Sequence, residues 1–354
     1  MPLEMTSRER VLTAARRKTP DRVPRTIPVE TGVIKTLKAY FKTGDLGAAL
    51  KDDHAWVGPL PSRLAQNLAP YFRRPGVTWD EWGRGRVWDS EEHYAEYLYP
   101  LEHAQTVDEI LNFPWPDLDE PYRYAGLKEK VAAFQNQGLA VVGGLQETVF
   151  EIAWQLRSFD QLFEDIHARD EKAVLLLDNI TDRRVAAAAE FARAGVDILS
   201  LGDDVAMQDR LLMSPRMWRQ WLRPRLERVI RAAKEIKPDI LVWYHSDGKI
   251  NDLVPDLIEA GVDILNPVQP ECVDHQWIKA TFGSQLAFSG GLGVQSILPF
   301  GTPEEVRQHV YNTFKTLGEG GGLIIGPSHV IERDTSLENI LAMLSAFDEY
   351  GRYA

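Results

Sequence analysis

The chain has 354 residues, a hydrophobic share of 44% and a charged share of 26%. These values are typical of a globular protein with a sizeable core, so disordered and fibrous classes are excluded and we expect a single domain over 1–354. The net charge of −12 argues against binding to nucleic acid or to an anionic membrane, because both need a surplus of Lys and Arg.

The sequence also indicates where the protein resides. Its one cysteine, Cys272, excludes a disulfide within the chain. Residues 1–17 are charged and lack the apolar core of a signal peptide, and no apolar run approaches the roughly 20 residues that span a bilayer. We therefore expect a cytoplasmic protein without membrane segments.

The N-terminal third is irregular. A cap-like Thr6 and apolar residues at helical spacing predict a helix over 6–17, and the stretch 22–30 predicts a short first strand that ends at Glu30. From about 40 to 121, aromatic residues alternate with Gly, Pro and charges without a helical period, which predicts an aromatic-rich insertion. Its tryptophans could roof a flat substrate, pack in the core or form a homodimer contact, and packing is favoured. They are Trp56, Trp79, Trp82 and Trp88.

From residue 127 onward, helices alternate with short apolar runs, which predicts βα units and a parallel sheet. The predicted strands are 140–143, 197–201, 240–244, 263–265, 286–288 and 323–325. The predicted helices are 159–194 (two helices with a bend), 214–237, 250–260, 303–317 and 336–350.

Two of these units nearly repeat each other. The stretches 193–200 and 259–266 share the sequence Ala-Gly-Val-Asp-Ile-Leu, in which Gly ends a helix and the apolar pair begins a buried strand. Similar units in succession predict a (β/α)8 TIM barrel. A doubly wound sheet is the alternative, but no strand is followed by a Gly-rich dinucleotide-binding fingerprint.

Polar or small residues follow each of the six predicted strands from residue 140 onward. In a barrel, these positions line one mouth, where the active site lies. In chain order they are Glu147; Asp203 and Asp204; His245 and Asp247; Asn266, Gln269 and Cys272; Gly290; and His329.

Each of these residues also has a purely structural explanation. Asp203 or Asp204 can cap the following helix, and Glu147 can interact with a helix dipole. Gly290 fits a tight turn, and Cys272 fits a small buried hydrophobe. His245 and His329 are different, because both follow apolar strands, and for them we favour a functional role.

A metal site would use this set economically. Zn²⁺ accepts imidazole, thiolate and carboxylate ligands, and a catalytic zinc has three protein ligands and one open position. His245 and His329, with either Asp247 or Cys272, would supply the three. The alternative is that Asp247 only orients a neutral His245 toward a substrate.

Several motifs together resemble the uroporphyrinogen decarboxylase superfamily over essentially the full chain. They are 5–12 with 20–24, Gly202-Asp-Asp204 with 214–215, His245-Ser-Asp-Gly248, Asn266-Pro-Val-Gln269, 290–291, 298–306, and 327–329 with 338–339. The resemblance implies a (β/α)8 barrel with its pocket at the C-terminal mouth.

The resemblance is closer to the cobalamin-dependent methyltransferase-like branch than to true uroporphyrinogen decarboxylases. The arginine-rich segment that decarboxylases carry after the first strand is absent from 25–32, and an acidic mouth would repel a substrate with many carboxylates. In the zinc-containing methyltransferases, a His-x-Cys-Gly motif and a second Cys are expected. Here His245 is kept, Asp247 replaces the first Cys, and Ser328 or His329 replaces the second.

The sequence therefore predicts a zinc-dependent methyltransferase or O-demethylase. It would move a methyl group between a small, for example methoxylated, substrate and a corrinoid protein or other methyl carrier. Asp203, Asp204 and Glu147 would orient the substrate or act as general acid, whereas Asn266, Gln269, Gly290 and Glu30 would line its pocket. The alternative is a decarboxylase-like lyase that acts on an organic acid without metal.

Overall fold

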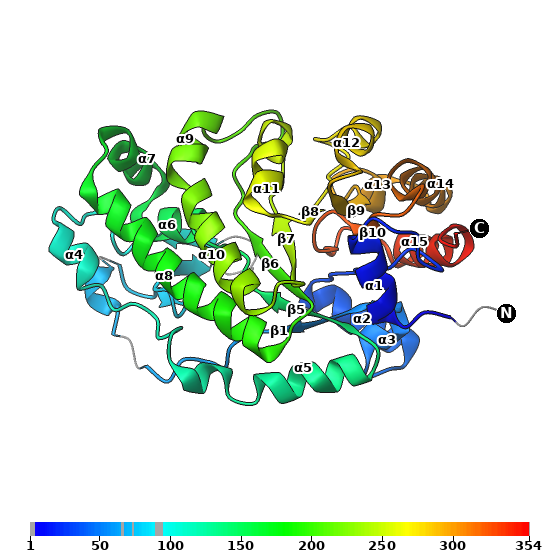
Figure 1. Ribbon diagram of the computed structural model, residues 1–354, viewed down its shortest axis with the longest axis horizontal. Coiled ribbons are helices and arrows are strands. Elements are labelled where there is room, and N and C mark those ends of the chain that lie inside the picture. The colour runs from blue at the N-terminus through cyan, green and yellow to red at the C-terminus, as the bar shows by residue number, and fades with distance from the viewer. Residues whose placement is uncertain (1–3, 65–66, 73, 89–94, 354) are drawn as a thin grey trace.

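The computed structural model describes residues 4–64, 67–72, 74–88 and 95–353. Seven parallel strands form one curved sheet in the order β1-β5-β6-β7-β8-β9-β10 (Figure 1). Their bounds are β1 His54–Val57, β5 Ala140–Gly144, β6 Ile198–Gly202, β7 Leu241–His245, β8 Ile264–Asn266, β9 Ala287–Leu292 and β10 Leu323–Pro327.

The helices lie around this sheet, and α8, α10 and α11 lie next to one another along it (Figure 1). The helices are α1 Ser7–Ala15, α2 Thr31–Phe41, α3 Leu46–Leu50, α4 Val107–Leu111, α5 Leu127–Asn136, α6 Phe150–Arg157, α7 Phe159–Ala168, α8 Glu171–Ala194, α9 Pro215–Trp221, α10 Arg223–Ile236, α11 Val254–Ala260, α12 His275–Phe282, α13 Ile297–Phe300, α14 Pro303–Thr313 and α15 Leu337–Tyr350. Among the residues described, no helix has both the length and the apolar character needed to cross a membrane.

The predicted strands from residue 140 onward are confirmed, and most are displaced by only one or two residues. The bend predicted within 159–194 is the break between α7 and α8. The single helix predicted over 214–237 is wrong, because it is interrupted at Leu222. Pro224 comes two residues later, and a proline lacks the N–H that a continuous helix would need there.

The predicted first strand, 22–30, joins the two edges of the sheet. The Thr26 N–H donates to the Ile325 carbonyl of β10 at 3.1 Å, and the Ile325 N–H donates back to the Pro24 carbonyl at 2.8 Å. On the other side, the Asp53 N–H donates to the Arg25 carbonyl at 3.2 Å, just before β1. These contacts are isolated bridges rather than a regular strand.

The stretch 40–121, predicted as an insertion, has two different parts. β1 belongs to the parallel sheet and pairs with β5. After it comes a small antiparallel sheet with the strands β2 Thr78–Trp79, β3 Gly85–Trp88 and β4 Ala95–Leu98. The start of any insertion therefore lies after residue 57.

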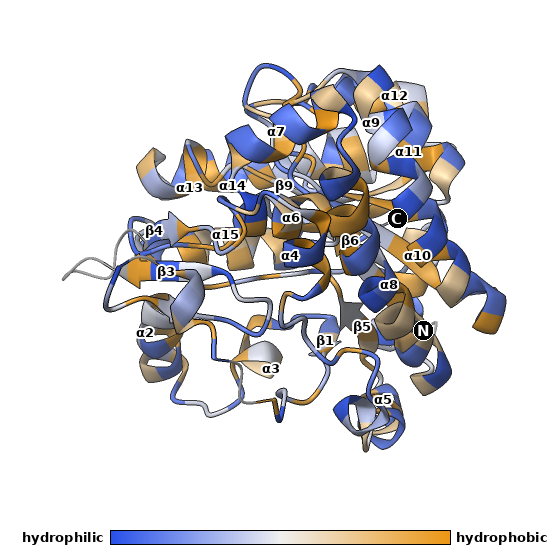
Figure 2. Cartoon of the chain, turned by 90° about the vertical axis from the view of Figure 1, so that its left-hand side faces the viewer, coloured by the Kyte–Doolittle hydropathy of each residue, from blue (hydrophilic) through white to orange (hydrophobic). Residues whose placement is uncertain are grey.

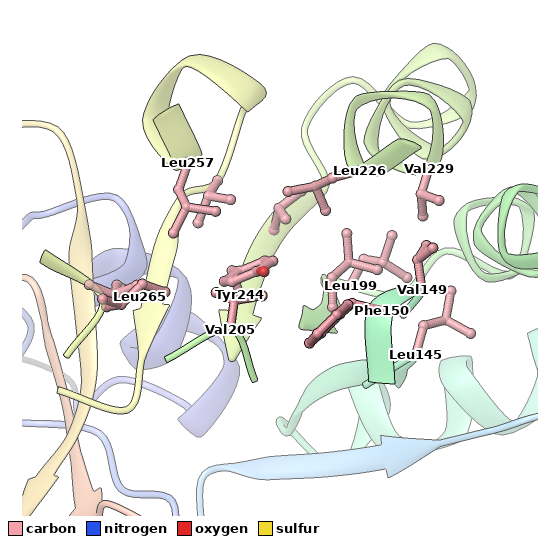
Figure 3. Packing of buried hydrophobic residues seen from close by; sticks show 14 of the residues in the cluster. Leu145, Val149, Phe150, Leu199, Val205, Leu226, Val229, Tyr244, Leu257 and Leu265 are labelled. Atoms are coloured by element: carbon pink, nitrogen blue, oxygen red, sulfur yellow. The ribbon is translucent and has the colours of Figure 1, made fainter. Parts of the chain in front are cut away.

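The two faces of the parallel sheet bury different cores. Alternate residues point outward to the helices, as Leu199, Tyr244 and Leu265 do in the cluster of Figure 3. The helices carry both hydrophobic and hydrophilic residues, as expected for elements with one face on a core (Figure 2).

The inward-pointing residues form a second, smaller core. It contains Val142, Ile198, Trp243, Ile264 and Ile324 from five strands, together with residues of α1. α1 lies against β1, β5, β9 and β10 and closes one end of the interior. The polar residues that follow the strands lie at the other end.

Candidate active site

The centre of the site is a cluster of three side chains, Asp204, His245 and Asp247. Their ligand atoms all lie within 4.8 Å of one another. Gly202 of β6 pairs in register with His245 of β7, so Asp204 and Asp247 each lie two residues beyond equivalent positions on neighbouring strands. The His245 Nε2 atom is 3.6 Å from Asp204 Oδ1 and 3.9 Å from Asp247 Oδ1.

A hydrogen bond fixes the orientation of His245. Its Nδ1 atom lies 2.7 Å from Asn266 Oδ1, and an amide oxygen can only accept, so Nδ1 carries the proton. The Asn266 amide in turn donates to Ser289 Oγ at 3.2 Å. In a neutral imidazole, the lone pair on Nε2 then points toward the two carboxylates.

Backbone contacts hold the two loops together. The Asp247 N–H donates to Asp204 Oδ1 at 2.8 Å, and the Val205 N–H donates to Ser246 Oγ at 3.2 Å. Gly202 allows this close approach, because a Cβ atom there would lie 2.4 Å from the His245 carbonyl oxygen. The cluster is therefore a rigid feature of two adjoining strand ends.

The cluster carries an excess of negative charge on partly buried side chains. Burial raises the pKa of Asp247, and the charge of Asp204 adds to the rise, whereas His245 and His329 oppose it. Burial, with Asp203 and Asp204, raises the pKa of Glu151 to about 9. Glu151 Oε2 accepts a hydrogen bond from the Asp204 N–H at 3.0 Å. A bound cation would relieve this repulsion.

Asp203 and Glu147 lie outside the cluster. The Asp203 carboxylate accepts hydrogen bonds from the Val149 and Glu151 N–H groups, so it ties the start of α6 to the end of β6. Burial raises its pKa, and these N–H groups counteract that rise. Glu147 pairs with Arg84 at 2.6 Å.

The residues predicted to bind substrate are spread over the mouth. Asn266 orients His245, and Gln269 accepts from the Gly248 N–H at 3.1 Å and donates to Gln295. Gly290 has a φ of 91° and packs against Pro267, so a side chain there would be strained. Glu30 forms an ion pair with Arg333 at 2.7 Å in a separate cavity.

His329 and Cys272 are not part of the cluster. His329 is exposed and lines a cavity of about 500 Å³ together with Asp247. The Cys272 thiol donates to Gln208 Oε1 at 3.0 Å, and burial raises its pKa. The third member of the cluster with His245 and Asp247 is Asp204, rather than His329 or Cys272. The roles of His245, Asp247, His329 and Cys272 as metal ligands stay a prediction.

Two residues near the site, Glu151 and Arg84, were not predicted from the sequence, and a third, Trp56, was predicted in the wrong element. Glu151 lies in the first turn of α6, four residues after Glu147, and helical spacing beyond a strand exit could have drawn attention to it. Arg84 lies in the turn between β2 and β3, and the sequence around it does not indicate that its partner is Glu147. Trp56 was assigned to the insertion, but it lies in β1 on the inward face, against Trp243.

A curved parallel sheet, with its polar side chains at the carboxyl ends of the strands, defines a TIM-barrel-like α/β protein. The family model for uroporphyrinogen decarboxylase (URO-D) matches residues 120–350, well over half of the chain. The chain belongs to this family.

The curated relatives belong to the methyltransferase-like branch. A methylcobamide:CoM methyltransferase, MtaA, from Methanosarcina barkeri is 27% identical over 210 residues, covering 59% of this chain and 58% of the relative. A methylated-thiol–coenzyme M methyltransferase from Methanosarcina mazei is 28% identical over 239 residues, covering 66% and 61%. The matched region spans less than two thirds of the length of each relative. The predicted resemblance to the methyltransferase-like branch is confirmed.

A solved structure agrees on the fold. A methyltransferase from Methanosarcina mazei superimposes with a TM-score of 0.66 at 18% identity, covering 98% of this chain and 99% of that one. This likeness supports the TIM-barrel-like architecture predicted from the repeated βα units.

Proposed function

We propose that this protein is a methyltransferase that binds zinc through Asp204, His245 and Asp247. It would transfer a methyl group between a small substrate and a methyl carrier, such as a corrinoid held by a partner protein. The observation that carries the proposal is the orientation of His245: its Nδ1 atom bonds to Asn266, and its Nε2 atom faces the carboxylates of Asp204 and Asp247. The names of the two relatives support the corrinoid and the methyl transfer.

The donor set fits zinc. Ligands that share one Zn²⁺ at tetrahedral angles lie roughly 3.3–3.6 Å apart, close to the 3.6 and 3.9 Å found from Nε2 to the two carboxylates. These separations are too long for hydrogen bonds between the imidazole and either carboxylate, so bonding between side chains does not explain why the three groups converge. A metal-binding His that donates its other N–H to a fixed acceptor is the usual arrangement.

The chain's own residues would divide the remaining work. The chemistry that zinc supplies at such a site is Lewis-acid stabilisation of an oxygen or sulfur anion. Asn266 keeps the His245 ring in one tautomer and orientation. Glu151, whose pKa is raised by burial and by the charges of Asp203 and Asp204, would be the acid beside Asp204 that holds a proton for the group that loses the methyl. An ether oxygen suits this oxygen-rich site better than a thiol.

We also propose that 22–30 acts as the eighth strand of a closed (β/α)8 barrel. Its hydrogen bonds to β10 on one side and to Asp53 on the other support this. Closure of the barrel is tested by measurements of stability, whereas the methyltransferase function is tested by metal analysis and activity.

Metal analysis tests the zinc site. Protein purified without added metal should hold about one zinc per chain, and His245→Ala and Asp247→Asn should lose it. His329→Ala and Cys272→Ala are the matched controls, since both side chains lie near the mouth but outside the cluster, and they should keep the metal. Metal-free wild type, or full zinc in His245→Ala, would contradict the proposal.

Activity separates methyl transfer from the alternative lyase. The wild type should demethylate methylcobalamin in the presence of an acceptor, followed by the change in corrinoid absorbance, and chelation should abolish the reaction. Release of CO₂ from an organic acid that survives chelation would instead support the lyase.

A further inference from the structure

We propose that Trp56 is the floor of the substrate pocket and selects an uncharged, planar methyl ether. This inference rests on the proposed function, which it deepens by naming the substrate class and the residue that recognises it.

The position of Trp56 is the first observation. Its ring lies 6.1 Å from that of Trp243, and His54 of the same strand contacts Trp243 as well. β1 and β7 are separated by β5 and β6 in the sheet, so these contacts cross the interior. Trp56 therefore points into the barrel.

The exposure of Trp56 is the second observation. Its side chain is 43% exposed, whereas Trp243 is 2% exposed. An inward-pointing aromatic ring with this exposure faces the open end of the interior, because α1 closes the other end. Trp243 and His245 are two residues apart on β7 and share a face, so the ring that Trp56 contacts lies directly below the proposed metal ligand.

The neighbours of Trp56 leave room above it. Gly144 of β5 has no side chain to cover the ring, and a Cβ atom built there would touch the indole at 3.7 Å. Gly202 and Ser200 of the next strand are likewise small. An exposed indole face beside small residues suits a flat ligand that stacks on it.

The charge of the mouth decides between ring substituents. A cavity at the same mouth, beside Asp247, is lined by Glu332 and Asp334. Trp56 is not among its lining residues, and neither is any described Lys or Arg. Ser328 lines it too, and its buried hydroxyl has no hydrogen-bond partner among the residues described. A carboxylate on the ring would be repelled, whereas a neutral hydroxyl could bind there.

Binding measurements test the inference independently of methyl transfer. The probe is 2-methoxyphenol, titrated by calorimetry into wild type, Trp56→Ala, Trp56→Phe and Trp79→Ala. Trp79 is the matched control, because it is similarly exposed, at 37%, but lies in the small antiparallel sheet. We expect Trp56→Ala to weaken binding at least about tenfold, Trp56→Phe to weaken it less, and Trp79→Ala to leave it unchanged.

The outcomes separate this inference from the proposed function. Equal affinity of wild type and Trp56→Ala, or no binding to wild type, would overturn it even if methyl transfer is observed. Binding of 2-methoxybenzoate as tight as that of 2-methoxyphenol would overturn the charge selection. If Trp56→Ala unfolds, Trp56→Phe decides, since the smaller ring keeps an apolar contact with Trp243 and should still show weaker binding.

Discussion

At the scale of single residues, the proposed site depends on Asn266 as much as on its ligands. Asn266 is not one of the proposed metal ligands, but it decides which nitrogen of His245 is free. Its sequence neighbours would not reveal this role, because the partner is on the adjoining strand and the register His245↔Asn266 brings the two side chains together.

Removing the Asn266 amide should therefore weaken zinc binding without removing a ligand. We expect Asn266→Ala to lower zinc affinity about 10- to 100-fold, measured by competition with a chromophoric chelator. Asn266→Asp keeps an acceptor for Nδ1–H and should retain most of the affinity. Gln269→Ala is the control, since Gln269 follows the same strand but bonds to Gly248 and Gln295. Equal losses in Asn266→Ala and Gln269→Ala would contradict the positioning role.

At the scale of elements, a buried carboxylate connects three segments that the sequence keeps apart. Asp53 precedes β1, is fully buried, and pairs with Arg10 of α1 and with Arg22. It also accepts from the Arg25 N–H and the Ser7 hydroxyl. Although burial raises the pKa of Asp53, these partners outweigh it and lower the pKa overall.

Asp53→Asn should destabilise the protein by about 3 kcal/mol in urea unfolding at pH 7, because buried Arg10 keeps only Asp21 as a close carboxylate partner and Arg22 loses the charge of Asp53. The pKa of Asp53 is lower in the folded state, so its contribution is present above the unfolded pKa and is lost as pH falls through the folded value. The difference between wild type and Asp53→Asn should therefore shrink below about pH 4.

The exposed pair of Asp239 with Lys237 supplies the control. Asp239→Asn should change the free energy of unfolding by less than about 1 kcal/mol. The role given to Asp53 would be refuted by a similar loss of unfolding free energy in both variants. It would also be refuted if the difference in unfolding free energy between wild type and Asp53→Asn grew as the pH is lowered.

Some strands and site residues could be predicted from the sequence, and others could not. Apolar runs located β5 to β10, because each strand is buried on both faces and bounded by polar residues. The same rule missed β1, in which polar His54 and half-exposed Trp56 face the interior. Asp204 could have been grouped with Asp247 by assuming neighbouring strands in register. The separation of His329 from the cluster could not have been predicted, since its position depends on a loop beyond β10.

At the scale of the whole molecule, the proposed closure of the sheet depends on the seam between 22–30 and β10. β9 and β10 pair over five residues, whereas 22–30 meets β10 through one isolated bridge, Arg25 to Ile325, and meets Ile331 beyond the strand through another at Val29. The irregular segment 22–30 forms hydrogen bonds to Ile325 of β10 on one side and to Asp53 on the other. On the β10 side the two backbones lie very close together. This proximity requires a residue without a side chain at the point of contact.

Gly326 is that residue, and a methyl group there should open the seam. A Cβ atom at Gly326 would lie 2.0 Å from the Thr26 carbonyl oxygen, so backbone must move. We expect Gly326→Ala to lower the free energy of unfolding by about 3 kcal/mol, at the upper end of overpacking costs. Gly144→Ala, whose Cβ would meet Trp56 at 3.7 Å, should change it by less than about 1 kcal/mol. Hydrogen exchange at the Thr26 N–H should accelerate in Gly326→Ala, while the β6–β7 pairing stays protected. Unchanged exchange at Thr26 would mean that 22–30 does not close the sheet as an eighth strand.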